Sequence, residues 1–284
     1  MPIYWSQDST DRVMSVRSAR KFHVDLLGDY GDPLFFHEGY ATGATNVNAL
    51  SAIYSNKVKS LGLTKGGLMR DSACARTKSR EHCAYSTTEH LWELGQERYP
   101  DMYNNPISEV ESWKFGVSES DLEKNRLLDP NTLEELQVSP VSTSLGRAVQ
   151  DFTVDFGAYE VTYGVNWKYD ESKATYKRHN YNGTPYNDNE GKQLEADTII
   201  FQQVKSYPTG NFKGHWVHNV IGTGDGWIMM NGSVFPVTWK KDSFSQKTKY
   251  YNPDGSEFIF RSGKIWVQIV DDDIEYIDNS LSER

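Results

Sequence analysis

The sequence predicts an α+β protein: an N-terminal α/β domain with a mostly parallel sheet, followed by a C-terminal, mainly antiparallel β domain. In the first part, short apolar strands alternate with segments of helical periodicity, which is typical of parallel sheets. In the second part, strand follows strand, and two junctions carry hairpin-turn sequences. An acidic segment separates the two patterns. We therefore divide the chain into residues 1–118, an acidic linker at 119–140, residues 141–271, and an acidic tail at 272–284.

The elements of the N-terminal part follow from its apolar residues. Three short apolar runs are predicted strands: Pro2–Trp5, Val13–Val16 and Leu34–His37. Apolar residues at helical spacing predict two helices: Ala19–Tyr30 and Ala44–Tyr54. Ser86 and Glu89 have the spacing of a capping box, which predicts a third helix ending near Tyr99.

The C-terminal part reads as a succession of strands. The predicted strands are Phe152–Phe156, Tyr159–Trp167, Thr198–Val204, Trp227–Met230, Val234–Trp239, Lys249–Tyr251, Glu257–Phe260 and Lys264–Val270. Asn231-Gly232 and Asp254-Gly255 separate neighbouring strands and favour tight hairpin turns. The chain after Val270 is rich in aspartate, and we expect it to fray.

The overall composition argues against some classes of function. The 284 residues carry a net charge of −9, which argues against binding of duplex nucleic acid through a general basic face. The sequence has no run of eighteen apolar residues, so no membrane span is predicted. The first residues lack the basic leader and apolar core of a signal peptide.

The two cysteines, Cys74 and Cys83, lie nine residues apart in a polar segment. Because this segment is too polar to be core, a disulfide in an oxidising compartment is favoured. Free thiols are the first alternative. A zinc site with His82 is the second, although no further cysteine pair or spaced histidine accompanies it.

The candidate binding residues begin with Arg17 and Arg20, which straddle a predicted junction of strand and helix. Backbone N–H groups and the helix dipole favour an anion at such a junction. The guanidinium fork matches the geometry of carboxylate and phosphate. The alternative is that both arginines form ordinary salt bridges with acids such as Asp25 or Asp71.

A series of short motifs follows the order of a known family. In the N-terminal part these motifs are Ser15–Arg20, Phe36–Gly39, Arg70-Asp71, His82 and Tyr85–Thr87. In the C-terminal part they are Tyr176–Arg178, Asp188–Leu194, Gly222–Trp227, Trp239–Lys241, Asn252–Gly255 and Gly263–Val270. Together they resemble the YerB-like bacterial lipoproteins, a domain family whose function is undefined.

The resemblance implies a compartment as well as a fold. Family members are tethered by a lipid to the outer face of the bacterial membrane, which agrees with the predicted disulfide. This chain starts at Met1 within the first domain, without the family's signal and anchoring cysteine. We therefore expect a chain that is truncated relative to the family, soluble by itself and extracytoplasmic in its intact form. Two departures are Ser15, where the family has proline, and Gly39–Ala41, where it has Gly-Gly-Ser.

The first functional hypothesis is a non-enzymatic protein that binds an anionic small molecule or envelope precursor, without a cofactor. Its site would lie at the carboxyl ends of the N-terminal strands, where open α/β sheets bind ligands. The candidate ligand-binding residues are Arg17, Arg20, His37, Arg70 and His82, with Arg76 as a further candidate. The alternative for His37 and His82 is a purely structural role.

Two other function classes compete with binding. The Arg70-Asp71 pair and the preceding arginines weakly resemble the LytR-CpsA-Psr cell-wall transferases. In that hypothesis Asp71 holds Mg²⁺ or acts as a base. A third hypothesis is that the β domain binds a partner or glycan through its aromatic residues, against the alternative that these rings are core. The rings concerned are Trp227, Trp239, Trp266, Tyr250 and Tyr251.

Overall fold

The chain forms two compact units, each assembled from segments that are distant in sequence. The computed structural model describes residues 12–14, 16–31, 33–62, 68–79, 83–104, 111–116, 142, 146–156, 164–188, 191–211 and 214–279. Unit 1 takes in Met1–Glu111, Tyr207–Ile221 and Lys241–Lys247, and unit 2 takes in the rest of the chain. The second and third segments of unit 1 therefore come from the part of the sequence that we assigned to the β domain. The predicted linker at 119–140 lies outside the described residues.

Unit 1 contains the predicted parallel sheet. Its three strands run in the order β2, β3, β4, and both neighbouring pairs are parallel. The strands are β2 (Val16–Ala19), β3 (Leu34–Tyr40) and β4 (Lys59–Gly62). The connections contain helix α1 (Lys21–Leu27), the short 3-10 helix η1 (Gly28–Tyr30) and helix α2 (Ala49–Ser55).

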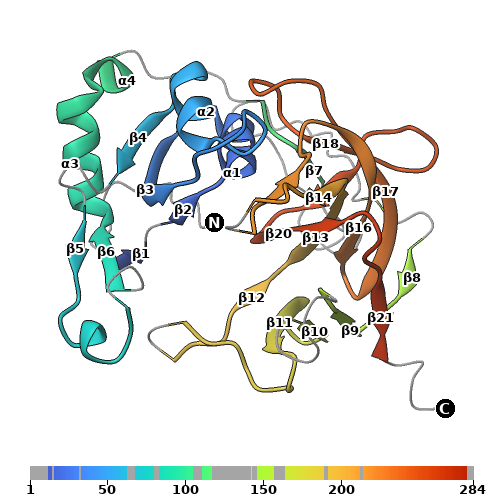
Figure 1. The fold of residues 1–284 in the computed structure, drawn as a ribbon. Coiled ribbons are helices and arrows are strands. Elements are labelled where there is room, and N and C mark those ends of the chain that lie inside the picture. Colours follow the sequence, from blue (N-terminus) through green and yellow to red (C-terminus); the bar gives the residue numbers. More distant parts are fainter. Residues whose placement is uncertain are drawn as a thin grey trace, which may run out of the picture. The chain divides into compact units, whose positions relative to one another are not determined.

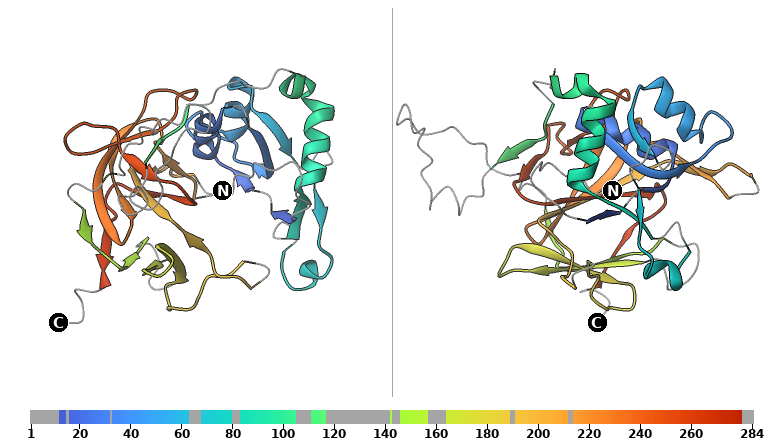
Figure 2. Two further views of the ribbon diagram at one scale, coloured as in Figure 1. Left: turned by 180° about the vertical axis from the view of Figure 1, so that it is seen from behind. Right: turned by 90° about the vertical axis from the view of Figure 1, so that its left-hand side faces the viewer.

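Helices cover both faces of this sheet (Figures 1 and 2). Phe35 packs on one face with residues of α1 and α2 such as Val24 and Ile53. Phe36 packs on the opposite face with Leu94 of α3 (Thr88–Arg98). Neighbouring strand residues point to opposite faces, so a strand covered on both sides needs a continuous apolar run. This explains why Leu34–Phe36 shows no alternation.

The beginnings of the helices differ from their predicted positions. Helix α1 starts at Lys21 rather than Ala19, because β2 continues to Ala19. Ser18 in that strand has a φ of 59°, a conformation rare for residues other than glycine. Helix α3 is capped by Thr87, whose Oγ1 accepts from the backbone N–H of His90 at 3.2 Å. The predicted cap Ser86 lies one residue too early, inside a strand.

A second sheet in unit 1 is antiparallel, with the order β1, β6, β5. It contains β1 (Arg12–Met14), β6 (Ala84–Thr87) and β5 (Met69–Arg70). The predicted strand Val13–Val16 thus spans the end of β1 and the start of β2. The predicted strand Pro2–Trp5 lies outside the described residues. Helix α4 (Pro100–Asn104) follows α3.

Cys74 and Cys83 form a disulfide, as the sequence predicts. Cys74 begins the 3-10 helix η3 (Cys74–Arg76), and Cys83 is fully buried just before β6. Asp71 Oδ1 accepts from the backbone N–H groups of Ala73 and Cys74, at 2.8 and 2.9 Å. The loop is therefore held at its base by the side chain of Asp71 as well as by the cross-link.

Reduction of this disulfide is expected to lower the free energy of unfolding by about 2–3 kcal/mol, because a short loop is closed in the unfolded chain. The measurement is urea unfolding with and without a reductant. A variant carrying Cys74→Ala and Cys83→Ala is the control, since the reductant should not change its stability. Equal stabilities of the oxidised and reduced wild-type protein would contradict this prediction.

Unit 2 is built of two main sheets, mostly antiparallel as predicted. One has the order β12, β11, β10, β9, β21, and the other has the order β18, β17, β16, β13, β20, with β8 beside β17. The first comprises β9 (Asp151–Val154), β10 (Val165–Asp170), β11 (Thr175–Asn180), β12 (Glu195–Ala196) and β21 (Tyr276–Asp278). The second comprises β8 (Arg147–Ala148), β13 (Thr198–Val204), β16 (Gly222–Met230), β17 (Ser233–Lys241), β18 (Lys249–Tyr251) and β20 (Ile265–Asp271).

The core of unit 2 lies between these sheets. Phe152 and Trp167 from one sheet and Phe201 and Met229 from the other are all fully buried in a single cluster. Strands β13 and β20 are parallel neighbours, an exception to the antiparallel pattern. A short strand pair in unit 2 joins β7 (Lys114–Gly116) with β19 (Ile259–Arg261), and another joins β14 (Ser206–Pro208) with β15 (Trp216–His218), of which residues from Tyr207 onward belong to unit 1.

Other expectations for the β domain can be compared with unit 2 directly. Asn231 and Gly232 have φ values of 52° and 72°, as a two-residue hairpin turn requires. Strand β21 pairs with β9, so part of the segment expected to be a frayed acidic tail is a strand. Of the aromatic residues considered for a binding surface, Trp239 and Tyr250 are buried. In the described part of the chain, no helix is long and apolar enough to cross a membrane.

Candidate anion-binding pocket

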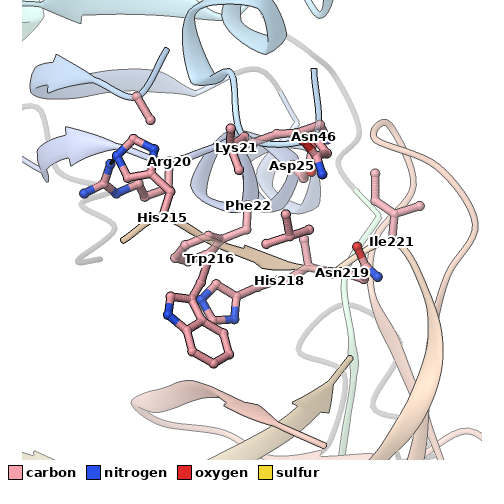
Figure 3. Close-up of a pocket in the computed structure, with 14 residues that line it drawn as sticks. Arg20, Lys21, Phe22, Asp25, Asn46, His215, Trp216, His218, Asn219 and Ile221 are labelled. Atoms are coloured by element: carbon pink, nitrogen blue, oxygen red, sulfur yellow. Dashed lines mark hydrogen bonds and ion pairs between the residues drawn. The ribbon is translucent and has the colours of Figure 1, made fainter. Parts of the chain in front are cut away.

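A small pocket in unit 1 opens at the carboxyl ends of β2 and β3. Arg20 follows the last residue of β2, and Ala41 follows the last residue of β3; both line the pocket. The opposite wall comes from residues 215–221, which include β15 (Figure 3). The cavity volume is about 170 Å³, below the usual range for drug-sized ligands. The pocket therefore suits a small group such as a phosphate, a carboxylate or a single ring.

Arg20 is held in place by two histidines. Its backbone N–H donates to His23 Nδ1 at 3.2 Å, and its Nη1 donates to His215 Nε2 at 3.1 Å. A guanidinium has donors only, so His215 Nε2 accepts, and the neutral imidazole carries its proton on Nδ1. Figure 3 shows His215 beside Arg20. Among the described residues, no carboxylate pairs with the Arg20 guanidinium.

The second cation of the pocket has its own counterion. Lys21 Nζ lies 2.5 Å from Asp25 Oδ2, one helical turn further on. Asp25 is buried, and burial raises the pKa of its carboxyl group although Lys21 acts in the opposite direction. The pair is formally neutral when both groups are charged. The positive charge available to a ligand therefore comes from Arg20.

An aromatic wall adjoins the arginine. The Phe22 ring contacts His23 and His218, with ring centroids 4.2 and 4.9 Å away. Burial lowers the pKa of His23 to about 4, and the charges of Arg20 and His218 act in the same direction. His23 is thus neutral at physiological pH. Trp216 also lines the pocket and remains 47% exposed.

Of the residues that the sequence suggests for ligand binding, Arg20 is the one that lines this pocket. Arg17 is exposed on β2 and stands opposite Glu38 in the strand register. His37 is buried: its Nδ1 lies 2.9 Å from the carbonyl oxygen of Gly39, and its Nε2 lies 2.7 Å from Ser60 Oγ. Both ring nitrogens of His37 are therefore engaged within unit 1.

Of the remaining candidates, Arg70, Asp71 and Arg76 do not line the pocket. Arg70 Nη2 contacts Glu38 Oε1 at 2.5 Å. Asp71 caps the disulfide loop, and Arg76 is exposed in that loop. His82 lies outside the described residues. Within the described part of the chain, no group of three or more His, Cys, Asp or Glu is placed to hold a metal ion.

Local sequence patterns do not predict the wall formed by residues 215–221. His215 contacts Arg20 across 195 positions of sequence, a pairing that no local pattern encodes. A signal existed in His215-Trp216-Val217-His218, which places two of the seven histidines beside a tryptophan.

The chain matches two family models. Residues 1–101 match the model described as "Protein of unknown function (DUF3048) N-terminal domain", and residues 152–267 match its C-terminal counterpart. No curated protein sequence matches the chain. Among solved structures, the YerB protein from Bacillus subtilis superposes with a TM-score of 0.66 at 20% identity. The match covers 94% of this chain and 78% of the YerB chain, and at this identity it establishes a common fold.

Proposed function

We propose that this chain, which belongs to the DUF3048 family of proteins of unknown function, binds a small anionic group in the Arg20 pocket of unit 1. The observation that carries the proposal is the contact between Arg20 and His215. In the part of the chain that the structure describes, no carboxylate pairs with this half-buried guanidinium, and a histidine nitrogen that accepts from it does not neutralise its positive charge. An anionic ligand would supply the missing charge through charge-assisted hydrogen bonds.

Comparison with the neighbouring cations supports this choice. Lys21 is paired with Asp25, and Arg70 is paired with Glu38. These two cations satisfy the expectation that charges with restricted access to water are paired. Arg20 departs from that expectation at the carboxyl edge of a parallel sheet, where open α/β sheets bind ligands.

The Cys74–Cys83 disulfide supports an extracytoplasmic setting for this binding. Structural disulfides persist in oxidising compartments and are rare in the cytosol. An envelope location would make anionic envelope precursors the natural ligand class. Binding without turnover is the activity proposed. The transferase alternative would need Asp71, which caps the disulfide loop and does not line the Arg20 pocket.

Replacement of Arg20 by glutamine is expected to weaken binding of inorganic phosphate or pyrophosphate by about tenfold or more. A hydrogen bond to a charged group contributes about 1.5–3 kcal/mol, and glutamine removes the charge. The measurement is isothermal titration calorimetry with each anion. Arg17→Gln is the matched control, because Arg17 is exposed on β2 and does not line the pocket.

The Arg17→Gln variant is expected to bind each anion within about twofold of the wild-type protein, since a rim charge contributes little. Equal losses in the two variants would point to a diffuse electrostatic effect rather than a site. No saturable binding of either anion to the wild-type protein would refute the proposed function.

A further inference from the structure

Besides Arg20, the pocket is lined by aromatic and amide side chains, which binding of a simple anion does not require. Trp216 is one of the large hydrophobic residues that remain exposed, with 47% of its surface accessible to solvent. Other tryptophans of the chain, such as Trp167 and Trp239, are fully buried. Trp216 and His218 are two residues apart on β15, so their side chains share one face of the strand. Figure 3 shows them together next to Phe22.

The polar groups around this aromatic face are suited to hydroxyl groups. Asn46 and Asn219 line the same pocket. A side-chain amide both donates and accepts hydrogen bonds, as a hydroxyl group does. The oxygens of a phosphate are bound mainly by hydrogen-bond donors of the protein. An aromatic surface with a few polar groups beside it is the usual composition of a small-molecule site. An exposed indole ring offers an apolar face to C–H groups and a polar N–H at its edge.

The size of the pocket limits what can occupy it. A volume of about 170 Å³ is small for a ligand that combines a base, a ribose and phosphates. It suits one ring with one charged substituent. The pocket offers an aromatic face, two side-chain amides and a guanidinium. This combination matches a sugar ring whose hydroxyl groups and anionic group point to different walls of the pocket.

We infer that the pocket recognises a monosaccharide that carries a phosphate or carboxylate group. This inference rests on the proposed function and extends it to the rest of the ligand. Trp216 stacks on the apolar face of the sugar ring. Asn46 and Asn219 bind its hydroxyl groups, and Arg20 binds the anionic group.

The test compares phosphate ligands with and without a sugar ring. The wild-type protein is titrated with the 1-phosphates of glucose, galactose and N-acetylglucosamine, and with glycerol 3-phosphate and inorganic phosphate. Glycerol 3-phosphate carries hydroxyl groups and a phosphate but has no ring. At least one sugar phosphate is expected to bind about fivefold or more tightly than glycerol 3-phosphate, as aromatic stacking allows.

Two variants test whether Trp216 causes the preference for sugar phosphates. Trp216→Ala is expected to remove the advantage of the sugar phosphate, measured as the ratio of its affinity to that of glycerol 3-phosphate in the same variant. Tyr207→Ala is the matched control, because Tyr207 is another exposed aromatic residue of unit 1 that does not line the pocket. It should retain the wild-type preference.

The outcomes separate the two proposals. If phosphate binds through Arg20 but no sugar phosphate binds more tightly than glycerol 3-phosphate, this inference is overturned and the proposed function stands. A sugar preference that survives in Trp216→Ala also overturns it. Sugar phosphates that bind equally to the wild-type protein and to Arg20→Gln would refute both proposals.

Discussion

Replacing Lys241 with alanine will lower the free energy of unfolding by about 3–5 kcal/mol, the cost of removing one partner from a buried ion pair. The Lys241 side chain is fully buried, and its Nζ donates to Asp29 Oδ1 at 2.5 Å. The same ammonium group donates to the carbonyl oxygens of Phe244, at 3.2 Å, and Gln246. Without Lys241, the buried Asp29 carboxylate loses the ammonium group that donates to its Oδ1, and both carbonyls lose a donor.

Urea unfolding followed by tryptophan fluorescence and circular dichroism measures the loss. The control is Lys240→Ala, because Lys240 is the preceding residue and is exposed; most surface substitutions change stability by less than about 0.5 kcal/mol. If Lys241→Ala does not fold, the double variant Lys241→Met with Asp29→Leu is the measurement, since removing both charges should restore folding. A loss below about 1 kcal/mol in Lys241→Ala, or no recovery in the double variant, would contradict the prediction.

The ion pair of Lys241 also illustrates what the sequence could not reveal. Lys241 ends a strand whose alternation and hairpin turn were predicted from neighbouring residues. Its partner, Asp29, lies 212 positions away. Strand alternation, helical spacing and turn residues are local properties, so they predict elements and fold class. The pairing of distant side chains depends on how the elements pack, and local patterns do not contain it.

The candidate site likewise has one residue that local patterns predicted and others that they did not. Arg20 was predicted because it follows a strand at the edge where parallel sheets bind ligands. Its histidine partner and the aromatic wall come from residues 215–221, which sequence periodicity assigned to another domain. The structure thus brings Arg20 and residues 215–221 together around one pocket. It also gives Arg70 and His37 partners within the protein, Glu38 and Ser60, that composition and spacing did not suggest.

Acidification is expected to destabilise unit 1 through His23. Burial lowers the pKa of His23 to about 4, from an ordinary value of 6.5. Below pH 6.5 the unfolded chain therefore takes up a proton that the folded chain resists until about pH 4. Stability attributable to His23 is complete above pH 6.5 and is lost as the pH falls toward 4, in total about 3 kcal/mol.

The His23→Gln variant isolates this contribution from the carboxylates that titrate in the same range. The amide oxygen of glutamine can accept from the backbone N–H of Arg20, as His23 Nδ1 does, and glutamine does not titrate. Urea unfolding at pH 7.5, 6.5, 5.5 and 4.5 should show the wild-type protein losing more stability than the variant at each step below 6.5. Asp25 acts in the opposite direction, because its pKa is raised by burial, but it is common to both proteins. Parallel curves would mean that His23 takes up its proton equally in the folded and unfolded chains. The His23 imidazole that accepts from the Arg20 backbone would then carry a positive charge below pH 6.5. The Arg20 guanidinium would lie near a second positive charge in that pH range.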